Sequence, residues 1–141
     1  MLQYEELRLR LINHEKTLDD LSEALGLDKM KEEIAQLEKE QTVDGFWDDI
    51  ANSQKVVQRT SNLKSKVAAY EKLRQDYDDA LVMIELSNEE EDEGMLDECT
   101  ESVEKFESDL DTMTLTTLLS GEYDAKNAIL TFHDGDRKSV V

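Results

Sequence analysis

Proline is absent from the 141-residue chain, and only five glycines interrupt it. Both residues are the usual signals of turns, bulges and edge strands, so their scarcity excludes a turn-rich β fold and favours long helices. Aromatic residues make up only 6% of the chain, against 38% for all hydrophobic residues. The core must therefore consist mainly of Leu, Val, Ile and Met, which suits a seam between helices.

Cysteine and long apolar runs are also scarce. Cys99 is the only cysteine, so no internal disulfide can form, and we expect a small buried hydrophobe in a reducing compartment. No run approaches the roughly 20 apolar residues that cross a bilayer. The first residues lack the apolar block of a signal peptide. A soluble, cytoplasmic protein without a membrane partner is therefore expected.

Basic residues are few, with 16 Lys and Arg against 35 Asp and Glu, which gives a formal charge of −19. A negative field of this size repels phosphate backbones, so we expect no direct nucleic-acid binding. Acidic surfaces usually keep long helices soluble. Attraction of a basic protein partner is the alternative interpretation.

The pattern that is present is a helical period from Val56 to Ile84. Apolar positions recur there in alternating steps of four and three, which keeps one stripe of a helix facing a partner. These positions are Val56, Thr60, Leu63, Val67, Tyr70, Arg74, Tyr77, Leu81 and Ile84. The spacing predicts one helix over residues 48–86 with Asp48 as its cap, about 58 Å long. Other helices must cover its stripe.

The same spacing predicts three further helices, over residues 2–25, 28–41 and 92–118. Gly26 is expected to end the first, and Asp28 to cap the second. The last helix would run back along the long one as a coiled-coil-like hairpin, while the first two form an arm over the rest of its stripe. The predicted fold class is mainly α, an elongated antiparallel helical bundle.

Aromatic residues and histidine on this framework are expected to be structural. Phe46 and Trp47 follow the Asp44-Gly45 turn, where they are predicted to plug the end of the bundle, and an exposed binding tryptophan is the alternative. His14 lies on the apolar stripe of the first helix without a second ligand nearby. We predict a half-exposed structural residue rather than a metal ligand.

Five consecutive acidic residues, Glu89, Glu90, Glu91, Asp92 and Glu93, follow the long helix. Like charges at this density resist packing, which predicts a solvent-facing reversal at the tip of the hairpin. The run lacks the alternating ligands around a central glycine that a calcium loop requires. It is the one candidate site, for contact with a partner protein. No catalytic, cofactor-binding or metal-binding residue is predicted, because histidine and cysteine lie scattered on separate elements.

The helical period stops at Ser120-Gly121. Apolar and polar residues then alternate around Leu130, which predicts a strand over residues 127–133. A lone strand is not stable in water, so it either pairs with another copy or begins a second domain. We therefore predict a helical domain over residues 1–120 and the start of an incomplete second domain over residues 121–141.

Two segments carry a resemblance to the bacterial class I peptide chain release factors, of the release factor 2 type. The sequence LLSGEYDAKNAILTFHDG, residues 118–135, resembles the start of their codon-reading domain. The sequence FWDDIANSQKVVQR, residues 46–59, resembles the turn and helix that open the long helix of their N-terminal domain. The likeness covers residues 27–133 strongly and the first helix more loosely. From residue 134 the tail departs from the family pattern, as a truncation, a changed reading frame or foreign residues would make it.

The resemblance implies a protein that ends translation at a stop codon by directing hydrolysis of peptidyl-tRNA. The Gly-Gly-Gln and Ser-Pro-Phe motifs of the family are absent from this chain, so the resemblance implies a non-catalytic fragment that contacts the ribosome. The implied partners are the stalk base of the large ribosomal subunit, its protein L11 and a recycling GTPase, with no cofactor. The alternative is a free-standing coiled-coil adaptor or chaperone-like protein, for which a concentration-dependent dimer is expected.

Overall fold

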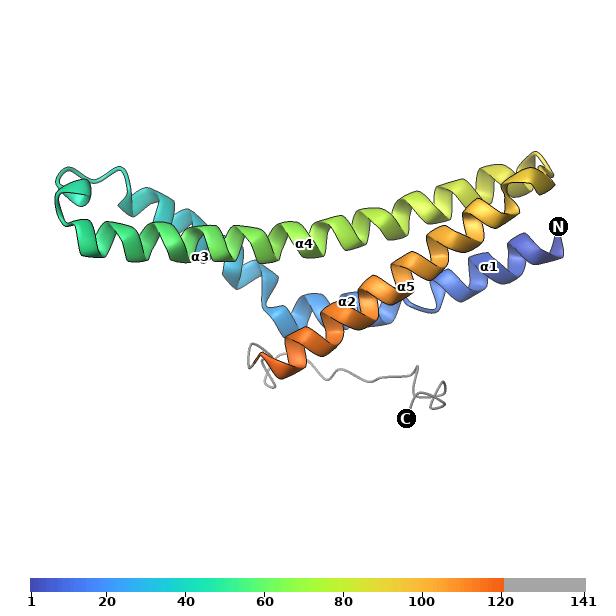
Figure 1. The fold of residues 1–141 in the computed structure, drawn as a ribbon, viewed down its shortest axis with the longest axis horizontal. Helices are drawn as coiled ribbons and strands as arrows, with labels where there is room; N and C mark the ends of the chain where they lie inside the picture. Colours follow the sequence, from blue (N-terminus) through green and yellow to red (C-terminus); the bar gives the residue numbers. More distant parts are fainter. Residues whose placement is uncertain (121–141) are drawn as a thin grey trace. The chain divides into compact units, whose positions relative to one another are not determined.

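The computed structural model describes residues 1–120, which form helices and short turns (Figure 1). The elements in order are α1 (Leu2–Ile12), α2 (Glu15–Leu25), α3 (Leu27–Glu40), η1 (Phe46–Asp48), α4 (Ile50–Glu89), η2 (Glu93–Met95) and α5 (Leu96–Leu119). The predicted helical bundle is confirmed for this part of the chain, in which no strand occurs. The strand predicted over residues 127–133 lies outside the described residues and gains no support from the structure.

The chain divides into two compact units. The hairpin unit contains Met1–Leu25 and the described residues from Leu73 onward, and the arm unit contains Gly26–Lys72. The helix α4 contributes its first part to the arm unit and its later part to the hairpin unit. The long helix predicted from the apolar period is thus present, and each of its two parts is covered within its own unit.

The core of the hairpin unit lies between α5 and the later part of α4, which run antiparallel (Figure 1). The Sγ atom of Cys99 lies 3.8 Å from the Oγ atom of Ser87, and the rings of Phe106 and Tyr77 are 5.6 Å apart. Helices α1 and α2 supply further buried side chains to this unit, so the prediction that the first helix forms part of the arm is wrong. The core of this unit includes Tyr4, Leu7, Leu11, Leu18, Leu21, Leu73, Ile84, Cys99, Val103 and Leu110. The predicted antiparallel hairpin and the buried cysteine are confirmed here.

The buried stripe of α4 differs from the predicted one at two positions. The structure buries Leu73 and Ala80, whereas Arg74 and Leu81 are only partly buried. Residues three and four positions further along a helix both flank the same stripe, so spacing alone does not choose between them. At Arg74 the charge favours the surface over the buried stripe, because its guanidinium pairs there with Asp19 at 2.5 Å.

The helix predicted over residues 2–25 is two helices, because the chain breaks at Asn13 and His14. Asparagine favours helix ends since its side chain competes for backbone hydrogen bonds. His14 is buried, not half-exposed, and its Nε2 atom lies 2.8 Å from a carboxylate oxygen of Glu107 on α5. Arg10 donates to both oxygens of the same carboxylate at 2.9 and 2.6 Å. The structural interpretation of His14 therefore stands, with Glu107 as its partner.

The predicted caps also need correction. Gly26 adopts the left-handed conformation expected of it, at φ +68°, but α3 then begins at Leu27, so Asp28 lies within the first turn and caps nothing. At the start of α4 the predicted cap Asp48 belongs to η1. The side chain of Asp49 instead accepts a hydrogen bond from the Asn52 amide at 3.1 Å. A short 3-10 turn after the glycine moved the start of the helix beyond the predicted cap.

In the arm unit, α3 runs antiparallel to the first part of α4. The pairs that join them are Lys31–Glu71 at 3.2 Å, Arg59–Glu33 at 2.9 Å, Gln41–Thr60 at 3.2 Å and Lys64–Glu38. Leu27 of α3 is buried and the other large apolar residues of this helix are half-buried, while α4 buries Leu63 and Tyr70. Exposed ion pairs stabilise by about 0 to 1 kcal/mol each. The arm unit therefore covers its part of the apolar stripe of α4 with a single layer of helix.

Truncation of a core side chain on α5 tests this register. Leu110 is 1% exposed and Leu115, on the same helix, is 56% exposed. We expect Leu110→Ala to lower the free energy of unfolding by about 2 to 4 kcal/mol, because it removes buried methyl groups and leaves a cavity. The matched control Leu115→Ala should change it by less than about 0.5 kcal/mol. Urea unfolding measures both, and equal losses would show that the packing face is wrong.

The Glu107 cluster makes stability depend on pH. Burial alone would raise the pKa of the Glu107 carboxyl, but hydrogen bonds from His14 and Arg10 and the charge of Arg10 lower it from 4.5 to about 2. Its stabilising contribution is therefore complete above about pH 4.5 and is lost as the pH falls through about 2. We expect Glu107→Gln to cost about 1 to 3 kcal/mol near pH 7.

The difference between the wild-type chain and Glu107→Gln should shrink as the pH falls from 5 toward 2, measured by urea unfolding at each pH. Glu101→Gln, at an exposed position of the same helix, is the control for loss of one negative charge. A difference that does not vary with pH would contradict the ionic role of the cluster.

Candidate partner-contact site

The acidic turn, Glu89 to Glu93, joins the two helices of the hairpin (Figure 1). All five residues are exposed, as predicted for a solvent-facing reversal. The turn closes through Glu91, which adopts a left-handed conformation at φ +52° although it is not glycine. Such a conformation is strained for a residue with a Cβ atom, so the surrounding structure must hold it in place.

Hydrogen bonds within the turn supply that restraint. The amide of Glu91 donates to the Asn88 carbonyl at 3.0 Å, and the amide of Asp92 donates to the Ser87 carbonyl at 3.0 Å. The Oδ1 atom of Asp92 accepts from the Gly94 amide at 2.9 Å, which caps η2. The four glutamate side chains of the turn form no ion pair with residues 1–120. Their carboxylates are thus available to a partner.

The first residues of the chain, at the start of α1, hold the acidic turn through hydrogen bonds. Tyr4 is fully buried, and its hydroxyl donates a hydrogen bond to the Asp92 carbonyl. Burial raises the pKa of Tyr4, and negative neighbours raise it further, so the phenol stays protonated and remains a donor. The N-terminal ammonium group donates to the Oδ1 atom of Asn88 at 2.6 Å. The acidic turn is therefore joined to the first residues of the chain by two hydrogen bonds.

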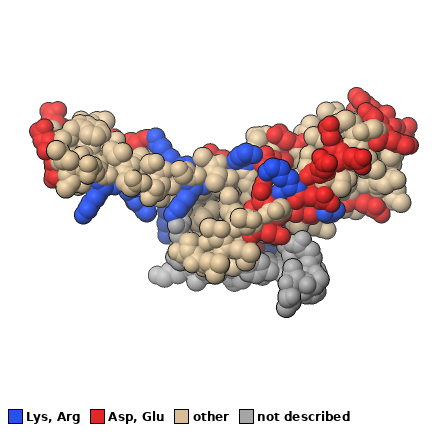
Figure 2. Space-filling model, in the orientation of Figure 1, with Lys and Arg blue, Asp and Glu red and all other residues tan. Residues whose placement is uncertain are grey.

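Charge is distributed unevenly between the units. The described residues of the hairpin unit include 22 acidic and 5 basic residues, whereas the arm unit has 9 and 8. Within α4, residues 50–70 contain four basic residues and no acidic one. Figure 2 shows blue side chains along this stretch and red side chains over the elements of the hairpin unit. The acidic turn therefore belongs to a unit whose whole field attracts a basic partner.

The total charge of −19 conceals this difference between the units. The signal was present in the sequence, as a gap without acidic residues between Asp49 and Glu71. The expectation of no nucleic-acid contact rests on the negative total charge, and the hairpin unit is indeed strongly negative. The arm unit, in contrast, has nearly equal numbers of acidic and basic residues.

Trp47 does not plug the bundle end as predicted. Phe46 is buried, but the Trp47 side chain is 58% exposed. Neighbouring side chains of a 3-10 turn point in different directions, so only one of two consecutive aromatics faces the bundle. The Trp47 ring meets Phe46 edge-on at 4.7 Å, and its Nε1–H donates to the Gln41 carbonyl at 3.2 Å. Trp47 is therefore exposed, as the alternative required, and its role in binding stays a prediction.

Within residues 1–120, no three His, Cys, Asp or Glu side chains lie close enough together to hold a metal ion. None of the helices in this described range combines the length and the apolar character needed to span a bilayer.

Comparison with known proteins decides the family. The family model described as the PCRF domain matches residues 30–136. The chain belongs to the PCRF domain family. Curated relatives of this PCRF-domain chain include peptide chain release factor 2 of Exiguobacterium sp. (strain ATCC BAA-1283 / AT1b), 36% identical over 134 residues, which are 95% of this chain and 37% of that protein. No solved structure matches significantly.

Other relatives agree with this membership. Peptide chain release factor 2 of Clostridium perfringens (strain SM101 / Type A) is 34% identical over 135 residues, which are 96% of this chain and 37% of that protein. The corresponding protein of Petrotoga mobilis is 30% identical over 135 residues, or 96% and 36% of the two chains. The resemblance to release factors is confirmed, and the free-standing adaptor is not favoured. This PCRF-domain chain spans about 37% of the length of the first relatives.

The support of the acidic turn by α1 is testable with Tyr4→Phe. This substitution keeps the buried ring and removes the hydroxyl that donates to the Asp92 carbonyl. We expect amide hydrogen exchange of Gly94 and Met95 to become about five to ten times faster, because local opening no longer breaks that hydrogen bond. Tyr70→Phe, in the arm unit, is the control. Unchanged exchange in the turn would show that the hydroxyl does not hold it.

Proposed function

We propose that this chain acts in translation termination as the non-catalytic helical part of a class I release factor. Residues 1–120 would form its N-terminal domain, and residues from 121 would begin its codon-reading domain. The observation that carries the proposal is the PCRF-domain match over residues 30–136, joined to relatives named peptide chain release factor 2. A cytoplasmic location follows from that role.

The proposed role is a binding role, because this chain lacks the Gly-Gly-Gln and Ser-Pro-Phe motifs associated with release and codon reading in the family. Peptidyl-tRNA hydrolysis needs groups placed at the ester bond, and the described residues offer a helical surface with no clustered nucleophile and base. The chain therefore contributes positioning on the ribosome rather than chemistry.

The acidic turn is the surface that we propose for this contact. Its four glutamates are exposed, have no partner among the described residues and stand on a hydrogen-bonded base. The surrounding unit carries 22 acidic residues, which disfavours RNA and favours a basic protein. The stalk base of the large ribosomal subunit with protein L11, and a recycling GTPase, are the proposed neighbours.

Neutralising the acidic turn tests this proposal. The variant carries Glu89→Gln, Glu90→Gln, Glu91→Gln and Glu93→Gln, and it keeps Asp92 because that side chain caps η2. We expect ribosome binding, measured by co-sedimentation at low salt, to weaken about threefold to tenfold, since rim charges mainly steer association. The melting temperature should change little. The unmodified chain, added to ribosomes stalled at a stop codon, should release no peptide.

The matched control removes the same number of charges elsewhere, through Glu6→Gln, Glu23→Gln, Glu101→Gln and Glu104→Gln, all at exposed positions of the hairpin unit. It should bind ribosomes within about twofold of the wild-type chain if contact is local to the turn. Equal weakening by both variants would remove the turn as the contact. Failure of the wild-type chain to bind ribosomes would contradict the proposed function itself.

A further inference from the structure

The later part of α4 exposes two large apolar side chains to solvent. Val82 is 52% exposed and Leu86 is 54% exposed, and residues four positions apart are neighbours on one face of a helix. The core-facing residues of this part of α4 lie on the opposite face. We call the exposed positions the outer face of α4, which consists of Gln75, Asp78, Asp79, Val82, Glu85, Leu86 and Glu89.

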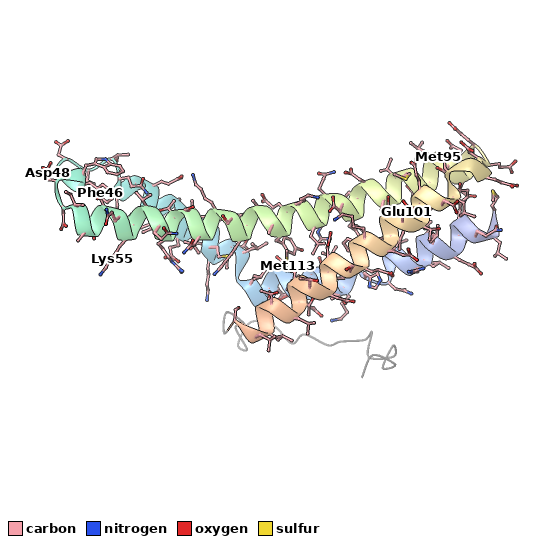
Figure 3. All side chains as sticks on the ribbon, in the orientation of Figure 1. Phe46, Asp48, Lys55, Met95, Glu101 and Met113 are labelled. Atoms are coloured by element: carbon pink, nitrogen blue, oxygen red, sulfur yellow. The ribbon has the colours of Figure 1, made fainter. Side chains whose placement is uncertain are left out.

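The neighbouring helices leave the outer face of α4 uncovered. Helix α1 lies on one side, where Arg8 meets Glu85 at 3.8 Å. Helix α5 lies on another side, where the Oγ atom of Ser102 is 4.0 Å from the Sδ atom of Met83. Met95, labelled in Figure 3, lies where α5 begins its return along α4. The apolar pair of the outer face therefore has no role in holding these helices together.

Carboxylates border the apolar pair on both sides. At about 100° of rotation per residue, Asp79 lies on one side of the pair and the other border residues lie on the opposite side. The border residues are Asp78, Asp79, Glu85 and Glu89, each three or four positions from a member of the pair. In coiled coils, charges that flank an apolar seam on both sides determine which helix is accepted as the partner.

The cations of the hairpin unit do not neutralise this border. Residues 75–104 contain 13 acidic residues and no Lys or Arg. Each of the five basic residues in the described part of the unit pairs with a carboxylate, and Arg74, the nearest along α4, pairs with Asp19 at 2.5 Å. Among the border residues Glu85 meets Arg8, and the other three form no ion pair with residues 1–120. Charge complementarity therefore requires a cationic partner.

We propose that the outer face of α4 binds a basic amphipathic helix of a partner protein. Apolar side chains of that helix would cover Val82 and Leu86, and its Lys and Arg side chains would lie against the border carboxylates. The same carboxylates repel RNA and a second copy of the chain. The inference goes beyond the proposed function and does not depend on it, because it concerns an apolar contact that the acidic turn cannot make. Glu89 alone belongs to both surfaces.

The probe for this contact is a labelled synthetic helix with leucine along one face and lysine on both flanks. Fluorescence anisotropy measures its binding to the full chain at about 150 mM salt, where general attraction to the negative chain is largely screened. The matched peptide keeps every lysine and replaces leucine with glutamine, which is also a good helix former. We expect the leucine peptide to bind at least about tenfold more tightly, because it alone buries apolar area on the outer face.

Matched variants locate the contact. Leu86 is 54% exposed and Leu9, on α1 of the same unit, is 51% exposed. Leu86→Gln should weaken binding of the leucine peptide about fivefold or more, and Leu9→Gln should leave it within about twofold of the wild-type value. Asp78→Lys should likewise weaken binding more than Glu6→Lys, an equal charge change at an exposed position of α1. Circular dichroism should show the helical content unchanged in all four variants.

Four outcomes overturn the proposal. Equal binding of the leucine and glutamine peptides would show attraction by charge alone, and equal weakening by Leu86→Gln and Leu9→Gln would place the apolar contact elsewhere. Equal binding of a peptide with leucine and glutamate would remove the charge selection. Dimers of the chain that dissociate in Leu86→Gln, measured by sedimentation, would assign the outer face to a second copy. Leu86→Gln keeps all five residues of the acidic turn, so its ribosome binding tests the proposed function separately.

Discussion

Burial of the apolar stripe along α4 is the constraint on which the other helices depend. A helix of 40 residues has an apolar face too long to remain in water, and each fully buried aliphatic or aromatic side chain contributes about 1.5 to 3 kcal/mol. In the hairpin unit α1, α2 and α5 all contribute to the buried core. In the arm unit α3 is the one long helix beside the stripe, and it contributes mostly half-buried apolar residues and surface ion pairs. Local opening should therefore start in the arm unit.

The same division explains where polar groups are buried. The hairpin unit is thick enough to enclose His14 and most of Glu107, so these groups need each other and Arg10 to compensate for lost water. The thin arm unit leaves its charges in solvent, where pairs such as Lys31–Glu71 are exposed. Buried polar contacts therefore fix the position of α5 on α1, whereas the arm relies on apolar contact and many weak surface pairs.

The sequence predicted the helices because each helix shows its apolar period in its own residues, whichever helix it packs against. It located the hairpin and the buried Cys99 for the same reason, whereas the left-handed Gly26 followed from the tolerance of glycine for positive φ at helix ends. It failed where two neighbouring residues compete for one place, as Leu73 and Arg74 do on α4. Spacing cannot resolve such competition, because it depends on volume and on distant charges such as Asp19. The strand over residues 127–133 stays a prediction.

The candidate site was predictable in part. Five consecutive carboxylates cannot pack against each other, so the exposure of Glu89 to Glu93 followed from the sequence. The support from Tyr4 was not predictable, because it joins residues 88 positions apart. The expected burial of Trp47 followed from the scarcity of aromatics, yet scarcity favours an exposed tryptophan equally well if a partner covers it.

The hairpin unit and the arm unit differ in charge, which argues for two kinds of contact. The acidic turn offers exposed carboxylates on a hydrogen-bonded base, which favours long-range steering of a basic protein. The arm unit carries almost balanced charge and exposes apolar side chains such as Trp47 and Ile50, which favours short-range apolar contact. Salt should weaken the first contact far more than the second, because screening acts on charges and leaves apolar burial intact. The salt dependence of the two interactions therefore distinguishes non-specific binding from recognition through two distinct surfaces.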